Sequence, residues 1–132
     1  MYCSSNTLGT LTTDHMLKVE WTAVDGWLTP RIIPYQNLSL DPATCVFHYA
    51  FECFEGLKAY KDKNGKIRLF RPRENMERLN KSSKRIALPT FDCEAFLKLI
   101  TEFVKTEAKF IPEYVARIVF HAHYQVYPQF IA

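Results

Sequence analysis

The sequence predicts an α+β fold in which a mixed sheet, including a β-hairpin, packs against helices. Three observations carry this prediction. Residues 15–21 alternate between apolar and polar side chains, which is the period of a half-buried strand. An Asn-Gly pair joins two short strand-like segments, residues 57–61 and 66–70. Apolar residues then recur every three and four positions in two later segments, as in amphipathic helices. Strands and helices grouped in this way favour a layered α+β structure.

The N-terminal third is expected to contain short strands. Residues 1–13 are rich in Ser, Thr, Asn and Gly and are expected to be irregular. In the strand predicted over residues 15–21, every second residue is apolar, namely Leu17, Val19 and Trp21. Asp25 and Gly26 mark a turn. Prolines bracket the extended residues 31–33, and proline confines a strand to a sheet edge or a strand end.

The pattern then changes to that of a helix. Apolar residues recur at helical spacing over residues 44–54, and Gly56 is predicted to end this helix. The predicted face is largely aromatic and consists of Val46, Phe47, Ala50, Phe51 and Phe54. The hairpin follows, and both Asn64 and Gly65 are expected to adopt positive φ in its turn.

Two further helices are predicted after the hairpin. Pro72 suits the first turn of a helix, where its missing N–H costs nothing, and Pro89 is expected to stop that helix. Asp92 is the predicted N-cap of the next one. Its apolar stripe is complete and comprises Phe96, Leu99, Ile100, Phe103 and Val104. From Tyr114 onward, alternating apolar residues indicate a strand.

Composition excludes several classes of protein. The four cysteines form no CxxC pair, which argues against structural zinc and a disulfide framework and for a reducing compartment. No apolar run reaches the roughly 20 residues of a membrane span. No targeting segment is recognisable, so cytoplasmic localisation is expected, with mitochondrial localisation as the alternative. Neither a nucleic-acid nor a membrane partner is expected, because the basic residues are confined to one stretch.

That basic stretch is the strongest electrostatic feature of the chain. Residues 58–85 hold eleven Lys and Arg against three Asp and Glu, a net charge of +8 where the whole chain carries +3. Arg73 and Arg78 fall in the first two turns of a predicted helix, where both the helix dipole and guanidinium groups favour phosphate. Tyr49, Phe51 and Phe54 could supply an aromatic wall beside the anion. A solvated basic hairpin with a packed aromatic face is the alternative interpretation.

The order of residues resembles a known family. The segments TDHMLKVEW, QNLSLDPATCVFHYAFECFEGLKAY, KIRLFRPRENMERL and ALPTFD resemble the branched-chain amino acid aminotransferases, in register, from about Leu8 to Pro112. These are fold-type IV enzymes that depend on pyridoxal 5′-phosphate (PLP). The resemblance implies that residues 1–112 are part of the small N-terminal domain. Residues 113–132 would be a divergent tail, and the large domain with the PLP lysine would be absent.

The resemblance also implies roles for individual residues. Arg78 matches the contact to the cofactor phosphate. Tyr49 and Phe54 match aromatic positions around the branched side chain of the substrate, and Tyr49 would serve the neighbouring subunit of a homodimer. The implied activity is amino transfer between Leu, Ile or Val and 2-oxoglutarate, with branched-chain 2-oxo acids as products.

Some positions depart from the family pattern. Leu8 stands where the family has an aromatic residue, Arg117 does not align with the arginine near the substrate carboxylate, and no lysine matches the one that forms the Schiff base. The chain is therefore expected to be a fragment that is inactive alone. The alternative is a non-catalytic binding or dimerisation module. His121 and His123 could ligate a metal, but a polar strand face is the favoured interpretation, and no metal is expected.

Overall fold

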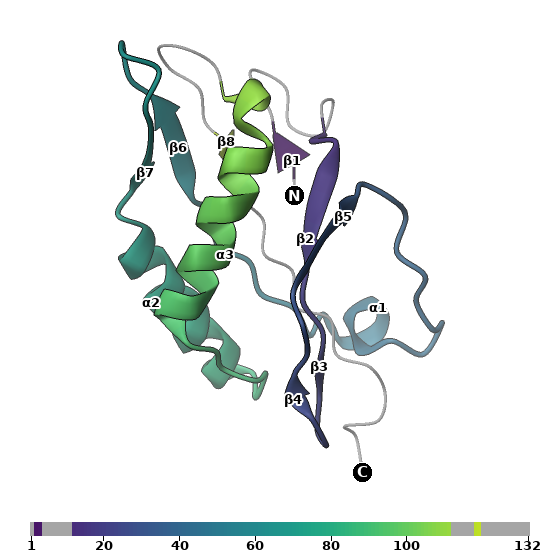
Figure 1. The fold of residues 1–132 in the computed structure, drawn as a ribbon. Coiled ribbons are helices and arrows are strands. Elements are labelled where there is room, and N and C mark those ends of the chain that lie inside the picture. Colours follow the sequence, from purple (N-terminus) through teal and green to yellow (C-terminus); the bar gives the residue numbers. More distant parts are fainter. Residues whose placement is uncertain (1, 4–11, 112–117, 120–132) are drawn as a thin grey trace.

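The computed structural model describes residues 2–3, 12–111 and 118–119, and these form an α+β arrangement of helices and small antiparallel sheets (Figure 1). The strands are β1 (Tyr2–Cys3), β2 (His15–Lys18), β3 (Trp21–Thr22), β4 (Gly26–Trp27), β5 (Arg31–Pro34), β6 (Lys58–Lys61), β7 (Ile67–Phe70) and β8 (Ile118–Val119). The helices are α1 (Cys45–Tyr49), α2 (Pro72–Arg85) and α3 (Cys93–Thr106), followed by a 3₁₀ turn η1 (Ala108–Phe110). Within these ranges every sheet is a two-stranded antiparallel pair, so the expected mixed sheet is not formed there.

The predicted N-terminal strands form a long ribbon. β2 pairs with β5, with His15 opposite Pro34 and Lys18 opposite Arg31. β3 pairs with β4 farther along the same ribbon, where the Leu28 amide donates to the Glu20 carbonyl (Figure 1). The predicted turn is confirmed, since Gly26 has a φ of +71° and the Asp25 amide donates to the Thr22 hydroxyl. The short extended piece flanked by prolines is also confirmed as a strand.

The predicted hairpin is confirmed as β6 and β7, with Lys58 opposite Phe70 and Lys61 opposite Ile67. Its turn differs from the prediction, because Gly65 has a positive φ and Asn64 does not. The Asp62 carboxylate accepts hydrogen bonds from the amides of Asn64 and Lys66, both at 2.9 Å. These bonds close the turn around an acidic side chain, so only the glycine needs the left-handed region.

Both predicted amphipathic helices are confirmed. Pro72 opens α2, and the Asp92 carboxylate caps α3 by accepting a hydrogen bond from the Ala95 amide at 2.7 Å. α2 ends at Arg85, before Pro89, and Ala87 with a φ of +57° lies between them. The chain therefore leaves the helix through a left-handed residue and not at the proline.

The core lies where α3 meets the hairpin and α2. Its buried side chains are Leu57, Ala59, Met76, Ile100, Phe103, Val104 and Ile111. α3 contacts both α2 and β2, and in Figure 1 it runs between the hairpin and the N-terminal ribbon. The helix stripe predicted from the sequence thus supplies three of these residues, and burial of this apolar surface is the main stabilising force.

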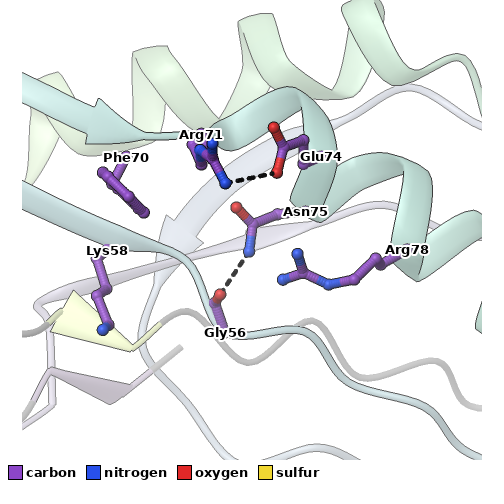
Figure 2. Close-up of a pocket in the computed structure, with 7 residues that line it drawn as sticks. All are labelled: Gly56, Lys58, Phe70, Arg71, Glu74, Asn75 and Arg78. Carbon is purple, nitrogen blue, oxygen red and sulfur yellow. Dashed lines mark hydrogen bonds and ion pairs between the residues drawn. The ribbon is translucent and has the colours of Figure 1, made fainter.

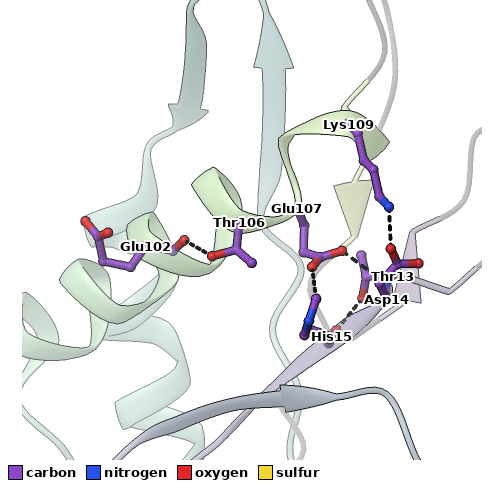
Figure 3. Close-up of polar contacts among 7 residues, drawn as sticks. All are labelled: Thr13, Asp14, His15, Glu102, Thr106, Glu107 and Lys109. Carbon is purple, nitrogen blue, oxygen red and sulfur yellow. Dashed lines mark hydrogen bonds and ion pairs between the residues drawn. The ribbon is translucent and has the colours of Figure 1, made fainter.

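A cluster of polar side chains connects the N-terminal ribbon with the end of α3 (Figure 3). The buried Glu107 carboxylate lies 2.6 Å from Nδ1 of His15 and accepts a hydrogen bond from the Asp14 amide at 3.1 Å. The Thr13 hydroxyl donates to the His15 carbonyl at 2.7 Å, and Lys109 forms an ion pair with Asp14. These contacts join segments more than 90 residues apart in sequence, so His15 has a structural position here.

The predicted helix over residues 44–54 is largely wrong. α1 covers only Cys45–Tyr49 and ends at Ala50, which has a φ of +52°, so Gly56 is not its cap. The aromatic residues of the predicted helix are exposed, with 59% of Phe47 and 38% of Phe51 accessible, so the packed aromatic face is also wrong. A helix this short gains most of its stability from packing, and Phe47 leaves more than half of its surface in water. Cys45 and Cys53 both fall within the predicted range, but only Cys45 lies in α1, and both are free thiols.

The C-terminal strand predicted from Tyr114 falls mostly outside the described residues. β8 is described, and Val119 pairs with Tyr2 of β1. The predictions for Leu8, Arg117, His121 and His123 concern residues that the structure does not describe. Across the described ranges, no helix is both long and apolar enough to span a bilayer.

Candidate functional site

Arg78 stands on α2 and forms a two-point ion pair with Glu55, which lies just before β6. Its Nε donates to Oε2 of Glu55 at 2.8 Å, and its Nη2 donates to Oε1 at 2.8 Å. Parallel bonds of this kind between guanidinium and carboxylate fix the orientation of both groups. The ion pair therefore sets the direction in which Arg78 points.

Glu55 is itself held by further donors. Its Oε1 accepts hydrogen bonds from the Gly56 amide at 2.9 Å and from Nδ2 of Asn75 at 3.3 Å. Nδ2 of Asn75 also donates to the Gly56 carbonyl at 2.7 Å, a bond drawn in Figure 2. The Glu55 side chain is 14% exposed and the Arg78 side chain 58% exposed. The carboxylate is thus the fixed partner, and the cation extends from it toward solvent.

The ion pair shifts the pKa values of Glu55 and Arg78 in opposite directions. Burial on its own would raise the pKa of Glu55, but the hydrogen bonds from Arg78, Asn75 and Gly56 outweigh it and hold this pKa below its usual range. The hydrogen bond and charge of Glu55 raise the pKa of Arg78. Both groups are therefore charged at neutral pH, and the pair persists across the physiological range.

Arg78 lines a small cavity of about 220 Å³ between the start of α2 and the hairpin (Figure 2). Its walls are formed by Gly56, Lys58, Phe70, Arg71, Glu74, Asn75 and Arg78. Three cations line this space, against the carboxylates of Glu74 and of Glu55, which pairs with Arg78, so three positive charges less two negative charges leave a net charge of +1. The volume is below the roughly 300 Å³ at which pockets for whole small molecules begin, and it suits a small anionic group.

Arg71 occupies an unusual position on this wall. It is the N-cap of α2 with a φ of +46°, a left-handed conformation that costs energy for a residue with a side chain. Its guanidinium lies 3.5 Å from Glu74 and 5.9 Å from the centre of the Phe70 ring. The backbone at the cavity is thus held in a strained conformation by its surroundings.

The residues that the sequence singled out are not all brought together. Arg78 lines the cavity, whereas Tyr49 and Phe54 do not. Tyr49 is the last residue of α1, and its side chain is 68% exposed. Phe54 is 63% exposed, although it directly precedes Glu55. Arg73, expected to help bind an anion, instead pairs with Glu94 of α3 at 2.8 Å.

Sequence reasoning missed the four other cavity residues with polar or charged side chains: Lys58, Arg71, Glu74 and Asn75. It also missed Glu55. Asn75 and Arg78 are three positions apart on α2, so they share a helix face, and that spacing could have pointed to a joint partner. The partner itself, Glu55, comes from a segment without regular structure, and no local pattern places it opposite that face. Across the part of the chain that the structure describes, no cluster of three potential metal ligands is present.

The chain is similar in sequence to several known proteins. No protein-family profile matches the chain. The cytosolic branched-chain-amino-acid aminotransferase of Saccharomyces cerevisiae is 58% identical over 101 residues, which cover 76% of this chain and 27% of the relative. The mitochondrial enzyme of the same yeast is 54% identical over 101 residues, covering 76% and 26%. The branched-chain-amino-acid aminotransferase of Dictyostelium discoideum is 55% identical over 100 residues, also covering 76% and 26%. The chain therefore spans about a quarter of the length of these relatives.

Proposed function

Because this chain is related to the branched-chain-amino-acid aminotransferases over three quarters of its length, we propose that it supplies part of the cofactor site of such an enzyme. In this proposal residues 1–112 belong to the small N-terminal domain of a fold-type IV enzyme, and residues 113–132 are a divergent tail. The complete protein transfers the amino group of Leu, Ile or Val to 2-oxoglutarate. The 132 residues alone are inactive, because none of their lysines matches the one that binds the cofactor covalently.

The observation that carries the proposal is the charged cavity at Arg78. A phosphate monoester is doubly charged, and a guanidinium binds it with directed hydrogen bonds. Lys58 and Arg71 line the same space and add to its positive potential. These residues fit the phosphate group of PLP, and the cavity of about 220 Å³ leaves the ring to be covered by other groups. When bound, PLP supplies the electron sink for amino transfer.

The exposed rings support the substrate and partner parts of the proposal. Tyr49 and Phe54 present large apolar surfaces to solvent. In the proposed enzyme they line the site for the branched side chain, with Tyr49 serving the neighbouring subunit of a homodimer. Burying one such aliphatic side chain contributes about 1.5–3 kcal/mol. Cytoplasmic localisation is proposed, with the mitochondrion as the alternative, since the relatives' names include both compartments.

A second function is favoured by the same rings. Exposed apolar patches are typical of interaction surfaces. Four aromatic residues close together in sequence, Phe47, Tyr49, Phe51 and Phe54, are exposed, so a non-catalytic binding or dimerisation module is the alternative. Sedimentation of the isolated chain separates the two: a stable dimer that neither PLP nor phosphate perturbs supports the module, and a monomer that binds phosphate supports the enzyme part.

The enzyme proposal is tested on the complete open reading frame. We expect the purified protein to bind PLP, seen in its visible absorbance, and to transaminate leucine. Arg78→Lys should weaken PLP binding at least about tenfold, because lysine cannot reproduce the directed bonds of the guanidinium. Arg73→Lys is the matched control, since Arg73 pairs with Glu94 outside the cavity. A protein without bound PLP and without leucine transamination refutes the assignment.

A further inference from the structure

The two edges of the Arg78 guanidinium differ in their hydrogen bonding. The edge formed by Nε and Nη2 is fully engaged by the Glu55 carboxylate. Nη1 makes no hydrogen bond to any residue of the described ranges, and the side chain lines the cavity shared with Lys58 and Arg71. We propose that Glu55 is a positioning residue, which holds one edge of Arg78 so that the Nη1 edge faces a phosphate dianion in this cavity. This inference rests on the proposed function of Arg78.

Glu55 differs from the acidic partners of two other arginines near the start of α2. Arg71 pairs with Glu74 and Arg73 with Glu94, and in both pairs the carboxylate is 53% exposed. Such exposed pairs fix side chains weakly. Glu55 is 14% exposed and accepts hydrogen bonds from the Gly56 amide and the Asn75 amide group as well as from Arg78. Only this carboxylate is anchored independently of its arginine, so it can act as a fixed support.

Two physical effects of Glu55 oppose each other at the cavity. Its negative charge repels an incoming phosphate, whereas its hydrogen bonds pre-organise the guanidinium that receives the phosphate. If charge dominates, removal of the charge strengthens phosphate binding. If positioning dominates, any change in the carboxylate geometry weakens it, even when the charge is retained. The two variants Glu55→Asp and Glu55→Gln separate these effects, because the first keeps the charge and the second keeps the length.

The experiment uses the full 132-residue chain, labelled with ¹⁵N and titrated with inorganic phosphate near neutral pH. Amide and guanidinium resonances are followed by NMR. We expect both Glu55→Asp and Glu55→Gln to raise the phosphate Kd about tenfold, the loss expected when a charge-assisted hydrogen bond is misdirected. The matched control is Glu94→Gln, which removes the partner of Arg73 on the neighbouring face, and it should change the Kd by less than about threefold.

A second measurement needs no variant and no ligand. In the wild-type chain the Nε–H of Arg78 should exchange with water more slowly than the Nε–H of Arg73, because Arg78 donates this hydrogen to Glu55 whereas Arg73 pairs with Glu94 through Nη2. Equal exchange rates overturn the inference, even if the Glu55 variants do not fold. Unchanged affinity in Glu55→Asp, together with tighter binding in Glu55→Gln, also overturns it while leaving the proposed function intact. A wild-type chain that binds no phosphate overturns both.

Discussion

Residues 93–106 and residues 44–54 have similar apolar patterns and different structures. Residues 93–106 repeat apolar side chains at helical spacing and form the helix α3, in which Phe103 is fully buried. Residues 44–54 carry a comparable repeat, yet α1 stops after five residues and leaves Phe47 59% exposed. Helical periodicity becomes a full helix only where another surface receives the apolar face. The segment that forms α3 is thus stabilised by packing in the core, whereas residues 44–54 present aromatic rings to solvent.

The largest expected effect comes from truncating a buried ring of α3, compared with an exposed ring of α1. Phe103→Ala should destabilise the chain by about 3–5 kcal/mol, because it removes a fully buried ring from the core. Phe47→Ala should change the free energy of unfolding by less than about 1 kcal/mol, since most of its ring already contacts water. Urea unfolding followed by circular dichroism measures both. Equal losses would mean that the aromatic segment is packed as tightly as the core.

The polar cluster around Glu107 gives the next largest effect on stability. Glu107→Gln should cost about 1–3 kcal/mol, because a buried carboxylate that bonds the Asp14 amide and contacts His15 loses its charge. Glu102→Gln is the control, since Glu102 of α3 pairs with Lys105 in solvent. The same urea titration reports the difference. A control that destabilises as much as Glu107→Gln would show that the cluster contributes nothing specific.

The N-terminal caps of α3 and α1 also differ. Asp92→Ala should destabilise the chain by about 1 kcal/mol, because the Ala95 amide loses its acceptor at the start of α3. Lys98→Ala, at an exposed position of the same helix, serves as the control and should be nearly neutral. α1 has no side-chain cap bond at Thr44, so an equivalent change there removes none. A neutral Asp92→Ala would contradict the capping geometry.

The smallest expected effect is a pH dependence at the cavity. The folded pKa of Glu55 lies below its unfolded value of about 4.3, so its stabilising contribution is fully present above that pH. The contribution is lost as pH falls through the lower, folded pKa. Glu55→Gln should therefore flatten the decline in stability below about pH 4.3 relative to wild type. An acid limb with the same slope in both proteins would show that Glu55 is not held by these bonds.

Much of the fold could be predicted from local sequence, because the decisive interactions are local. The proline at the start of α2, the Asp92 cap and the stripe of α3 each act within a few residues, and all three are observed. The length of α1 and the conformation of Asn64 were not predictable in this way. The first depends on whether distant surfaces cover the rings, and the second on the Asp62 carboxylate taking over the bonds of the turn.

The candidate site was predictable only in part. Arg78 was identified from the order of residues around it, and it does line a positively charged cavity. Its partner Glu55 was not, because the two residues lie 23 positions apart and meet only when the segment before β6 crosses the face of α2. Tyr49 and Phe54 were predicted as pocket residues from the resemblance, and in the structure neither of them lines the cavity at Arg78.

The most direct test compares two ligands that differ only in the phosphate. The ¹⁵N-labelled chain is titrated with pyridoxine 5′-phosphate and with pyridoxine, which both lack the aldehyde that would react with lysines. We expect shifts at Gly56, Asn75 and the Arg78 guanidinium with the phosphorylated compound alone, and loss of the Gly56 and Asn75 shifts in Arg78→Lys. Equal shifts with both ligands, or shifts confined to the exposed rings of α1, would contradict this expectation.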